Sequence, residues 1–174
     1  DDEPRQARRG EQALRERVER GDVERHEDVG TAVLDLVRER GGQTIVELGS
    51  IRSAGAQKSD GHSTLAWCES GLATWSVDID CRATRLTAKL VGSRFPRVRC
   101  LTCDGIWFLD TFQHPIDLLY LDGPHPDKEN GRQWAADAFV AALPRFSPRA
   151  VLLIDDTDLP RRGKGELAIP LAES

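Results

Sequence analysis

Short apolar runs alternate along this chain with longer stretches whose apolar residues recur at helical spacing. Runs rich in β-branched and apolar residues are typical of buried strands. We expect five strands: one that begins at Thr44 and ends before Gly49, then Thr74–Ile79, Val98–Cys103, Ile116–Leu121 and Ala150–Ile154.

Helices are expected before and between these strands. Gly41 and Gly42 end the first one, whose apolar stripe consists of Val29, Ala32, Val33, Leu36 and Val37. Later helices are expected at about 62–70, at 106–112, and along the apolar faces Ala83/Leu86/Leu90 and Ala135/Ala138/Phe139/Ala142/Leu143. This alternation predicts an α/β fold: a Rossmann-like, doubly wound, mostly parallel sheet with helices on both faces.

We predict two parts of unequal size, a charged segment at 1–28 and a single domain at 29–174. The first part is dominated by Arg, Glu and Asp, with Ala7, Leu14 and Val18 at roughly helical spacing. It reads as a solvated helix or frayed arm, or alternatively as a lid or dimer arm over a ligand site.

Charge and composition exclude several classes of function. The net charge of −5 and pI of about 5.4 argue against a nucleic-acid-binding or anionic-membrane surface. The sequence has neither a membrane-span pattern nor a signal-peptide pattern, so we expect a cytoplasmic protein with no membrane partner. The four cysteines are read as reduced core residues, with a zinc or redox pair at Cys100 and Cys103 as the alternative.

Every predicted strand ends in acidic residues or is followed directly by them. They are Glu47, Asp78 with Asp80, Asp104, Asp122, and Asp155 with Asp156. In an open α/β sheet, ligands bind at the carboxyl ends of the strands, where an acid after the second strand can accept both hydroxyls of a ribose. Each acid alone could instead be solvated or cap a helix.

The stretch from Thr44 to Thr64 joins a buried strand, a glycine turn and a helix N-terminus. Gly49 follows the strand, and Gly61-His62-Ser63-Thr64 opens the next helix after a loop. In a parallel sheet this arrangement is typical of a pocket for a polar ligand. Glu47 in that pocket disfavours a phosphate.

The motifs ELGS, GHST, SVDID, CLTCDG, LYLDG and LLIDD, in this order, resemble the class I S-adenosylmethionine-dependent methyltransferases. The resemblance covers residues ~25–174 and is closest to small-molecule O-methyltransferases of the catechol O-methyltransferase type and to bacterial relatives in natural-product and sugar modification. The loop between ELGS and GHST is longer here than in that family.

The resemblance implies a set of binding residues for S-adenosylmethionine. Glu47, Gly49 and Ser50 would lie against its methionine part and Ser63 would bind its carboxylate. Asp78 would bind the ribose hydroxyls, and Cys103 and Asp104 would lie beside the adenine. Magnesium would be held by Asp122, Asp155 and Asp156, and His125 stands where the metal-dependent branch has a lysine base. His62 and His114 are weaker candidates for the base.

The implied activity is metal-assisted O-methylation of a small-molecule hydroxyl. Its alternative is a degenerate or non-catalytic S-adenosylmethionine-binding domain that acts through a partner, and a homo-oligomer is left open. A nicotinamide-dependent oxidoreductase is disfavoured because no GxGxxG follows the first strand.

The C-terminal segment predicts a departure from the family's seven-stranded sheet. After the fifth strand, Leu167, Ala168, Leu171 and Ala172 have helical spacing, which favours a helix, with an edge strand as the alternative. We therefore expect a sheet of order 3-2-1-4-5, with strands six and seven missing and the acceptor half incomplete.

Overall fold

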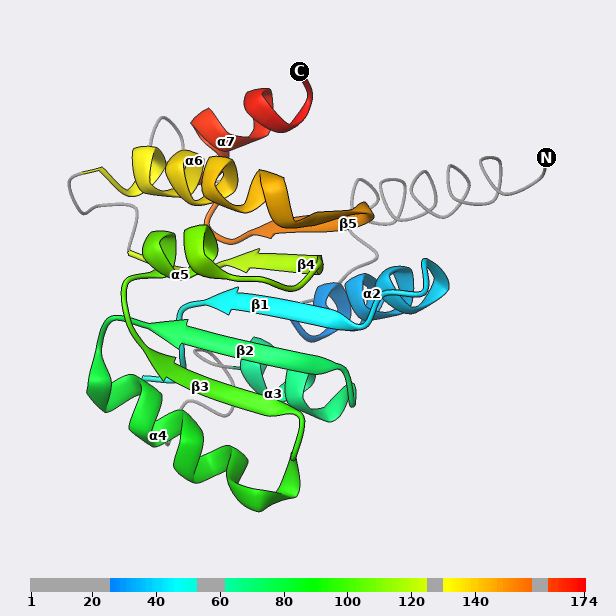
Figure 1. Ribbon diagram of the computed structural model, residues 1–174, viewed down its shortest axis with the longest axis vertical. Helices are drawn as coiled ribbons and strands as arrows, with labels where there is room; N and C mark the ends of the chain where they lie inside the picture. Colours follow the sequence, from blue (N-terminus) through cyan, green and yellow to red (C-terminus); the bar gives the residue numbers. More distant parts are fainter. Residues whose placement is uncertain (1–25, 53–61, 125–129, 158–162) are drawn as a thin grey trace.

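A five-stranded parallel sheet of order β3-β2-β1-β4-β5 forms the centre of the protein (Figure 1). The computed structural model describes residues 26–52, 62–124, 130–157 and 163–174. The strands are β1 (Thr44–Leu48), β2 (Ala73–Asp78), β3 (Val98–Thr102), β4 (Ile116–Leu121) and β5 (Phe146–Ile154). The predicted fold class and strand order are confirmed.

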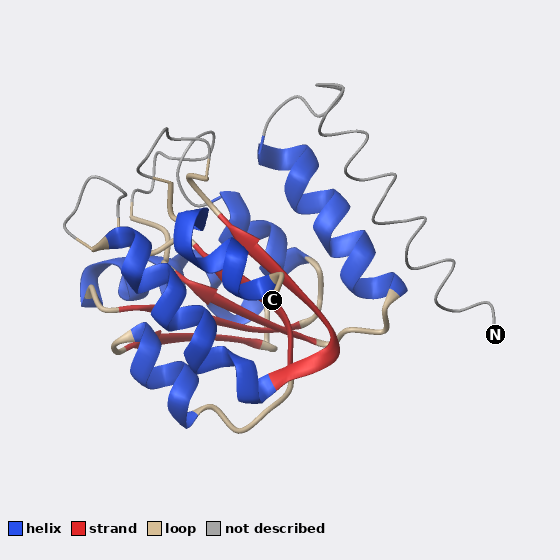
Figure 2. Ribbon diagram, turned by 90° about the horizontal axis from the view of Figure 1, so that it is seen from above, coloured by secondary structure: helices blue, strands red, loops and turns tan. Residues whose placement is uncertain are grey.

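Six α-helices and two 3-10 turns precede, connect and follow the strands within the described residues. The helices are α2 (His26–Glu39), α3 (His62–Glu69), α4 (Cys81–Val91), α5 (Gly105–Thr111), α6 (Gly131–Ala142) and α7 (Gly165–Ala172), and the 3-10 turns are η1 (Gly92–Arg94) and η2 (Leu143–Arg145). Figure 2 shows helices on both sides of the sheet. None of the described helices has both the length and the apolar character needed to cross a membrane.

Two apolar layers hold the helices against the sheet. On one face, α2 and α3 pack on the central strands through Val37, Trp67 and Leu118. On the other face, α5, α6 and α7 pack over a larger cluster that includes Leu119 and Phe139. Because β1 and β4 are covered on both faces, their side chains are almost all buried, as parallel strands require.

Strand ends are where the sequence-based bounds differ from the structure. Ile79 was predicted inside a strand, but it follows β2 and is 74% exposed. The chain turns there because the backbone N–H of Asp80 donates to Asp78 Oδ1 at 2.8 Å. β5 begins at Phe146, earlier than predicted, since Phe146 pairs with Ile116 across an irregularity in the β4–β5 register.

The cysteines are only partly core residues. Cys68 is buried, Cys100 and Cys103 are half-buried, and Cys81 is exposed at the start of α4. All four are free thiols. The prediction of core packing is therefore correct for Cys68 and wrong for Cys81, which lies beyond the end of β2.

The C-terminal segment forms helix α7, as predicted, and the alternative of an edge strand there is wrong. Ala168 is fully buried against α6, and Arg132 of α6 forms a 2.7 Å ion pair with Glu166 of α7. Pro170 lies in the last turn of the helix, where it removes one backbone donor. Among the described strands, β5 pairs with β4 alone.

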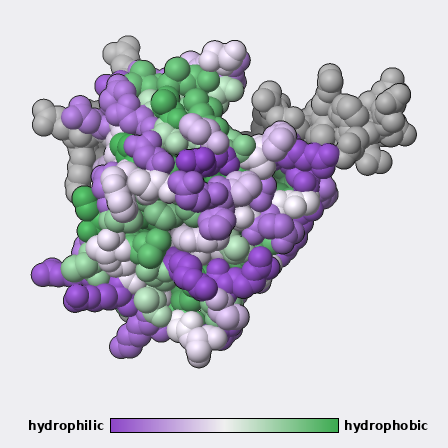
Figure 3. Space-filling view, in the orientation of Figure 1, coloured by the Kyte–Doolittle hydropathy of each residue, from purple (hydrophilic) through white to green (hydrophobic). Residues whose placement is uncertain are grey.

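Apolar side chains gather on the outer surface of α6, η2 and α7. This surface lies at the top of the space-filling view (Figure 3). The exposed residues there are Val140, Leu143, Leu167, Ile169 and Leu171.

The predicted charged arm at 1–28 lies outside the described residues, apart from its last three positions, which begin α2.

Candidate active site at the carboxyl edge of the sheet

Gly49 brings the ends of β1 and β4 together. Its φ of 120° is a backbone conformation that residues with a side chain rarely adopt, and a Cβ there would collide with the backbone carbonyl of Asp122. Asp122 N donates to Leu48 O at 2.9 Å, so the chain after β4 continues against β1. The glycine predicted from the sequence as a turn is needed for both the turn and this close approach.

Glu47 is a buried carboxylate surrounded by hydroxyl donors. Its side chain is 1% exposed and accepts hydrogen bonds from Thr64 Oγ1 at 2.8 Å, Ser76 Oγ at 2.8 Å and Ser63 Oγ at 3.2 Å. Burial raises the pKa of Glu47 to about 7, with the nearby Asp122 charge adding to the rise and the three hydroxyls opposing it. The carboxyl thus titrates near neutral pH.

Asp78 ends β2 with its side chain turned back over the β1–α3 loop. It is 6% exposed and accepts from Ser50 N at 3.1 Å and Asp80 N at 2.8 Å. Arg52 lies 3.5 Å from Asp78 Oδ2, while the arginine itself is half exposed. Each carboxylate oxygen can accept further hydrogen bonds, so the residue fits a pair of ribose hydroxyls.

Asp80 and Asp104 act as helix caps. Asp80 accepts from Arg82 N at the start of α4, and Asp104 accepts from Trp107 N at 2.9 Å at the start of α5. Cys103 lies beside Asp104, and its N–H donates to Asp78 O at 3.1 Å. The role of Cys103 and Asp104 beside an adenine stays a prediction.

Two exposed apolar side chains near these caps were not among the sequence-based candidates. Ile79 follows β2 and is 74% exposed, and Trp107 lies in the first turn of α5 and is 60% exposed. Ile79 comes directly after β2, and Trp107 is the third residue of α5, which follows β3. Their exposure at the ligand edge of the sheet suits contact with a flat aromatic ligand.

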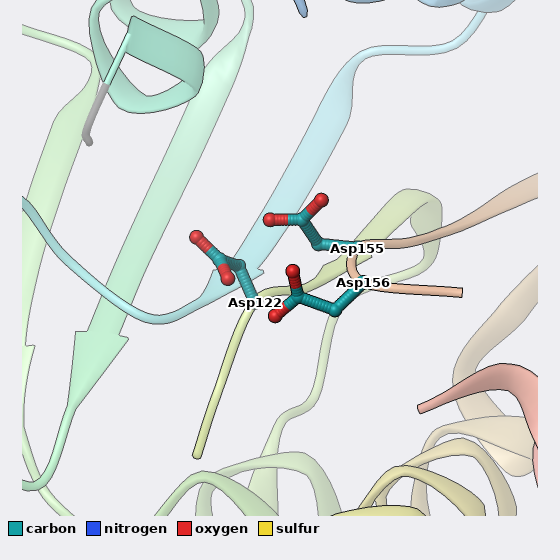
Figure 4. Close-up of side chains that lie close together, drawn as sticks. All are labelled: Asp122, Asp155 and Asp156. Atoms are coloured by element: carbon teal, nitrogen blue, oxygen red, sulfur yellow. The ribbon is translucent and has the colours of Figure 1, made fainter. Parts of the chain in front are cut away.

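Asp122, Asp155 and Asp156 converge beyond β4 and β5. One carboxylate oxygen from each lies within 4.8 Å of the others, and Figure 4 shows the three side chains close together. Asp155 N donates to Leu121 O at 3.1 Å, which continues the β4–β5 pairing up to the cluster. The sequence placed these acids at one edge, and the structure brings them together.

Lys164 also belongs to this cluster, and sequence reasoning missed it. Its Nζ lies 3.2 Å from Asp122 Oδ1 and 3.0 Å from Asp156 Oδ2, and its side chain is 1% exposed. Burial raises the pKa of Asp122, and Asp155 adds to the rise, while the Lys164 ammonium lowers it. One lysine therefore offsets only part of the cluster's negative charge.

The donor set fits a hard divalent cation. Magnesium and similar ions prefer carboxylate oxygens, and three of these lie close enough to share one ion. Three carboxylates and one ammonium also leave a net charge of about −2, which one such ion would neutralise.

Two parts of the predicted site lie outside the described residues. His125, the candidate base, is one of them, and most of the loop between Ser50 and α3 is the other. Of the weaker histidine candidates, His62 begins α3, and His114 stacks on Trp75 with ring centroids 5.8 Å apart. Because His114 precedes β4, it lies at the opposite edge of the sheet from the acid cluster.

The fold has known counterparts. A family model described as a methyltransferase domain matches residues 46–157, which is more than half of the chain. The chain therefore belongs to this methyltransferase family, and its fold is that of the class I S-adenosylmethionine-dependent enzymes. No curated protein sequence matches it.

Several solved structures share the fold at low sequence identity. SAH-bound Podospora anserina methyltransferase PaMTH1 aligns with a TM-score of 0.59 at 18% identity, covering 97% of this chain and 79% of its own. The Bacillus cereus O-methyltransferase in complex with SAH has a TM-score of 0.57 at 17% identity, covering 94% and 76%. MycE methyltransferase from the mycinamycin biosynthetic pathway, in complex with Mg and SAH, aligns with a TM-score of 0.50 at 18% identity. The alignment covers 75% of this chain and 34% of the MycE chain.

Proposed function

We propose that this protein transfers the methyl group of S-adenosylmethionine to a hydroxyl of a small molecule with the assistance of a divalent metal. The observation that carries the proposal is the pairing of two acidic sites at one sheet edge. Buried Asp78 lies on one side of β1, and the Asp122/Asp155/Asp156 cluster lies on the other. A cosubstrate over the first site would present its reactive end toward the second.

The residues for the cosubstrate are those on the β2 and β3 side of β1. Asp78 would accept the ribose hydroxyls, and Ser63 with Glu47, Gly49 and Ser50 would face the methionine part. The adenine would lie near Cys103 and Asp104, with Ile79 and Trp107 as added apolar contacts. Support comes from the two SAH-bound structures that share the fold over most of the chain.

When bound, S-adenosylmethionine supplies an electrophilic methyl group, and a divalent cation on the acid cluster supplies Lewis acidity toward the acceptor hydroxyl. Asp122, Asp155 and Asp156 would hold that cation, and MycE offers a magnesium precedent in the same fold. The chain's own contribution is to orient the two reactants in line.

Methyl transfer forms an oxygen–carbon bond to the acceptor as the carbon–sulfur bond breaks, and the electron pair of that bond goes to sulfur. We assign the acceptor's hydroxyl proton to the imidazole of His125, which as a neutral base can take a proton near pH 7. This assignment rests on the position of His125 three residues after Asp122 in the sequence.

Isothermal titration with S-adenosylhomocysteine tests the cosubstrate site. Asp78→Asn should weaken binding by roughly 1–3 kcal/mol, because the neutral amide replaces a charged acceptor with a weaker one and adds a donor that faces backbone N–H groups. The exposed Asp137→Asn on α6 is the matched control and should bind as the unmodified protein does. Equal affinity in the Asp78 variant would count against the site.

Turnover with a panel of phenols, catechols and sugars tests the reaction itself. We expect methylation that exhaustive EDTA treatment abolishes and added magnesium restores. Binding of S-adenosylhomocysteine without turnover on any acceptor would favour the non-catalytic alternative, and turnover that survives EDTA would remove the metal from the proposal.

A further inference from the structure

Lys164 has the most deeply buried cationic side chain in the described part of the chain. It is 1% exposed, and its Nζ lies within 3.2 Å of two carboxylates of the acid cluster. A buried ammonium without such partners is costly, so its place here depends on the acids. The acids in turn repel one another and gain from a cation beside them.

The backbone around Lys164 is closely packed and holds this side chain at the acid cluster. Its own N–H donates to Asp156 O at 3.1 Å, so main chain and side chain both bind the same aspartate. Gly163 packs against the backbone of Thr157, and a Cβ at Gly163 would lie 2.6 Å from Thr157 O. At Gly165 a Cβ would meet the Ile169 side chain at 2.6 Å and that of Thr157 at 3.0 Å.

Lys164 shares two of the three carboxylates that would hold a divalent ion. Its contacts are to Asp122 and Asp156, while the described contacts of the Lys164 ammonium do not include Asp155. A divalent ion on all three residues would therefore bring a second positive charge close to the ammonium. Unlike charges attract and like charges repel over such distances with energies well above thermal energy.

We propose that Lys164 is a resident counter-cation that organises the acid cluster and competes with a divalent ion for Asp122 and Asp156. This inference rests on the metal site of the proposed function. Lys164 is a positioning residue: it holds both aspartates, ties the start of α7 to the site, and keeps metal affinity low. Metal binding then requires the ammonium to be displaced from at least one carboxylate.

The test is the affinity for Mn²⁺ alone, measured by isothermal titration on the full chain. Lys164→Met removes the charge and keeps an unbranched apolar side chain, so it should bind Mn²⁺ about tenfold or more tightly than the unmodified protein. Lys164→Arg keeps the charge and should stay within about threefold of the unmodified protein. The matched control is Lys89→Met, an exposed lysine in the last turn of α4, which should leave the affinity unchanged.

Thermal unfolding supplies a second readout. Without metal, Lys164→Met should melt at a lower temperature than the unmodified protein. Saturating Mn²⁺ should raise the melting temperature of Lys164→Met by more than it raises that of the unmodified protein. If the variant does not fold in EDTA, recovery of its circular dichroism spectrum on adding Mn²⁺ supports the proposal. Failure to recover in millimolar Mn²⁺ overturns it.

The outcomes separate this inference from the proposed function. If the unmodified protein binds Mn²⁺ and Asp155→Asn weakens that binding, the metal site stands; an equal or lower affinity in Lys164→Met then overturns the competition alone. If only Lys164→Met binds Mn²⁺, competition is supported and the metal role in the unmodified protein fails. If neither binds, both proposals fail.

Discussion

Glu47 should make the stability of this protein depend on pH, and Glu47→Gln should remove that dependence. The carboxyl is fully buried, and burial raises its pKa from 4.5 to about 7. Folding therefore favours the protonated form. The contribution of protonated Glu47 to the stability of the fold is fully present below pH 4.5 and is lost as the pH rises through 7.

The magnitude follows from the size of the rise. A difference of about 2.5 pKa units corresponds to about 3 kcal/mol of unfolding free energy between the two ends of this interval. Glutamine is neutral at every pH and can still accept from Thr64 and Ser76. The variant and the unmodified protein should thus be about equally stable at pH 4.5, and the variant should be more stable by about 3 kcal/mol at pH 8.

Urea unfolding at pH 5, 6, 7 and 8, without cosubstrate, measures this difference. Other groups with raised pKa values, Asp122 among them, titrate in both proteins and largely cancel. Glu39→Gln, at an exposed position in the last turn of α2, is the matched control and should show no such growth with pH. A difference that stays constant with pH, or an increasingly unstable Glu47→Gln as pH rises, would refute the reasoning.

Three further predictions concern packing and the base. Gly49→Ala should lower the unfolding free energy, measured by urea unfolding, by at least about 2 kcal/mol, because Gly49 has a φ of 120° and a Cβ there would collide with the Asp122 carbonyl. Gly71→Ala is the control: Gly71 has a φ of 75° with open space around it, so the change should cost only about 1 kcal/mol. Leu119→Ala, at a fully buried position, should cost about 2–5 kcal/mol in the same assay, and Val140→Ala, 50% exposed, less than about 0.5 kcal/mol. His125→Ala should slow turnover by about 100-fold or more while S-adenosylhomocysteine binding stays unchanged; near-normal turnover would exclude it as the base.

The sequence determined the elements of the sheet and the edge that carries the chemistry. Apolar runs such as Ile116–Leu121 mark buried parallel strands because both of their faces must be covered, and this strand was placed with its exact bounds. The acids at the strand ends lie together for the same reason, since the carboxyl ends of parallel strands meet at one edge. Local rules of periodicity and turn chemistry were enough for both.

Strand ends were less predictable because tertiary contacts decide them. Phe146 extends β5 toward its start, since it pairs with Ile116, which is far away in the sequence, and packs on Phe139 of α6. Ile79 was predicted inside the strand, yet the Asp78 carboxylate accepts from Asp80 N, and the chain turns at Ile79. In both cases a specific contact outweighs local propensity.

Only the tertiary structure revealed which charges face one another. Lys164 stands between two glycines in a polar segment, and its partner Asp122 is 42 residues away. Likewise, Ser76 and Thr64 are ordinary strand and helix residues until the fold turns their hydroxyls onto Glu47. The cost of burying a charge is met by partners that only folding brings within reach, so burial and pairing of these groups are properties of the folded chain.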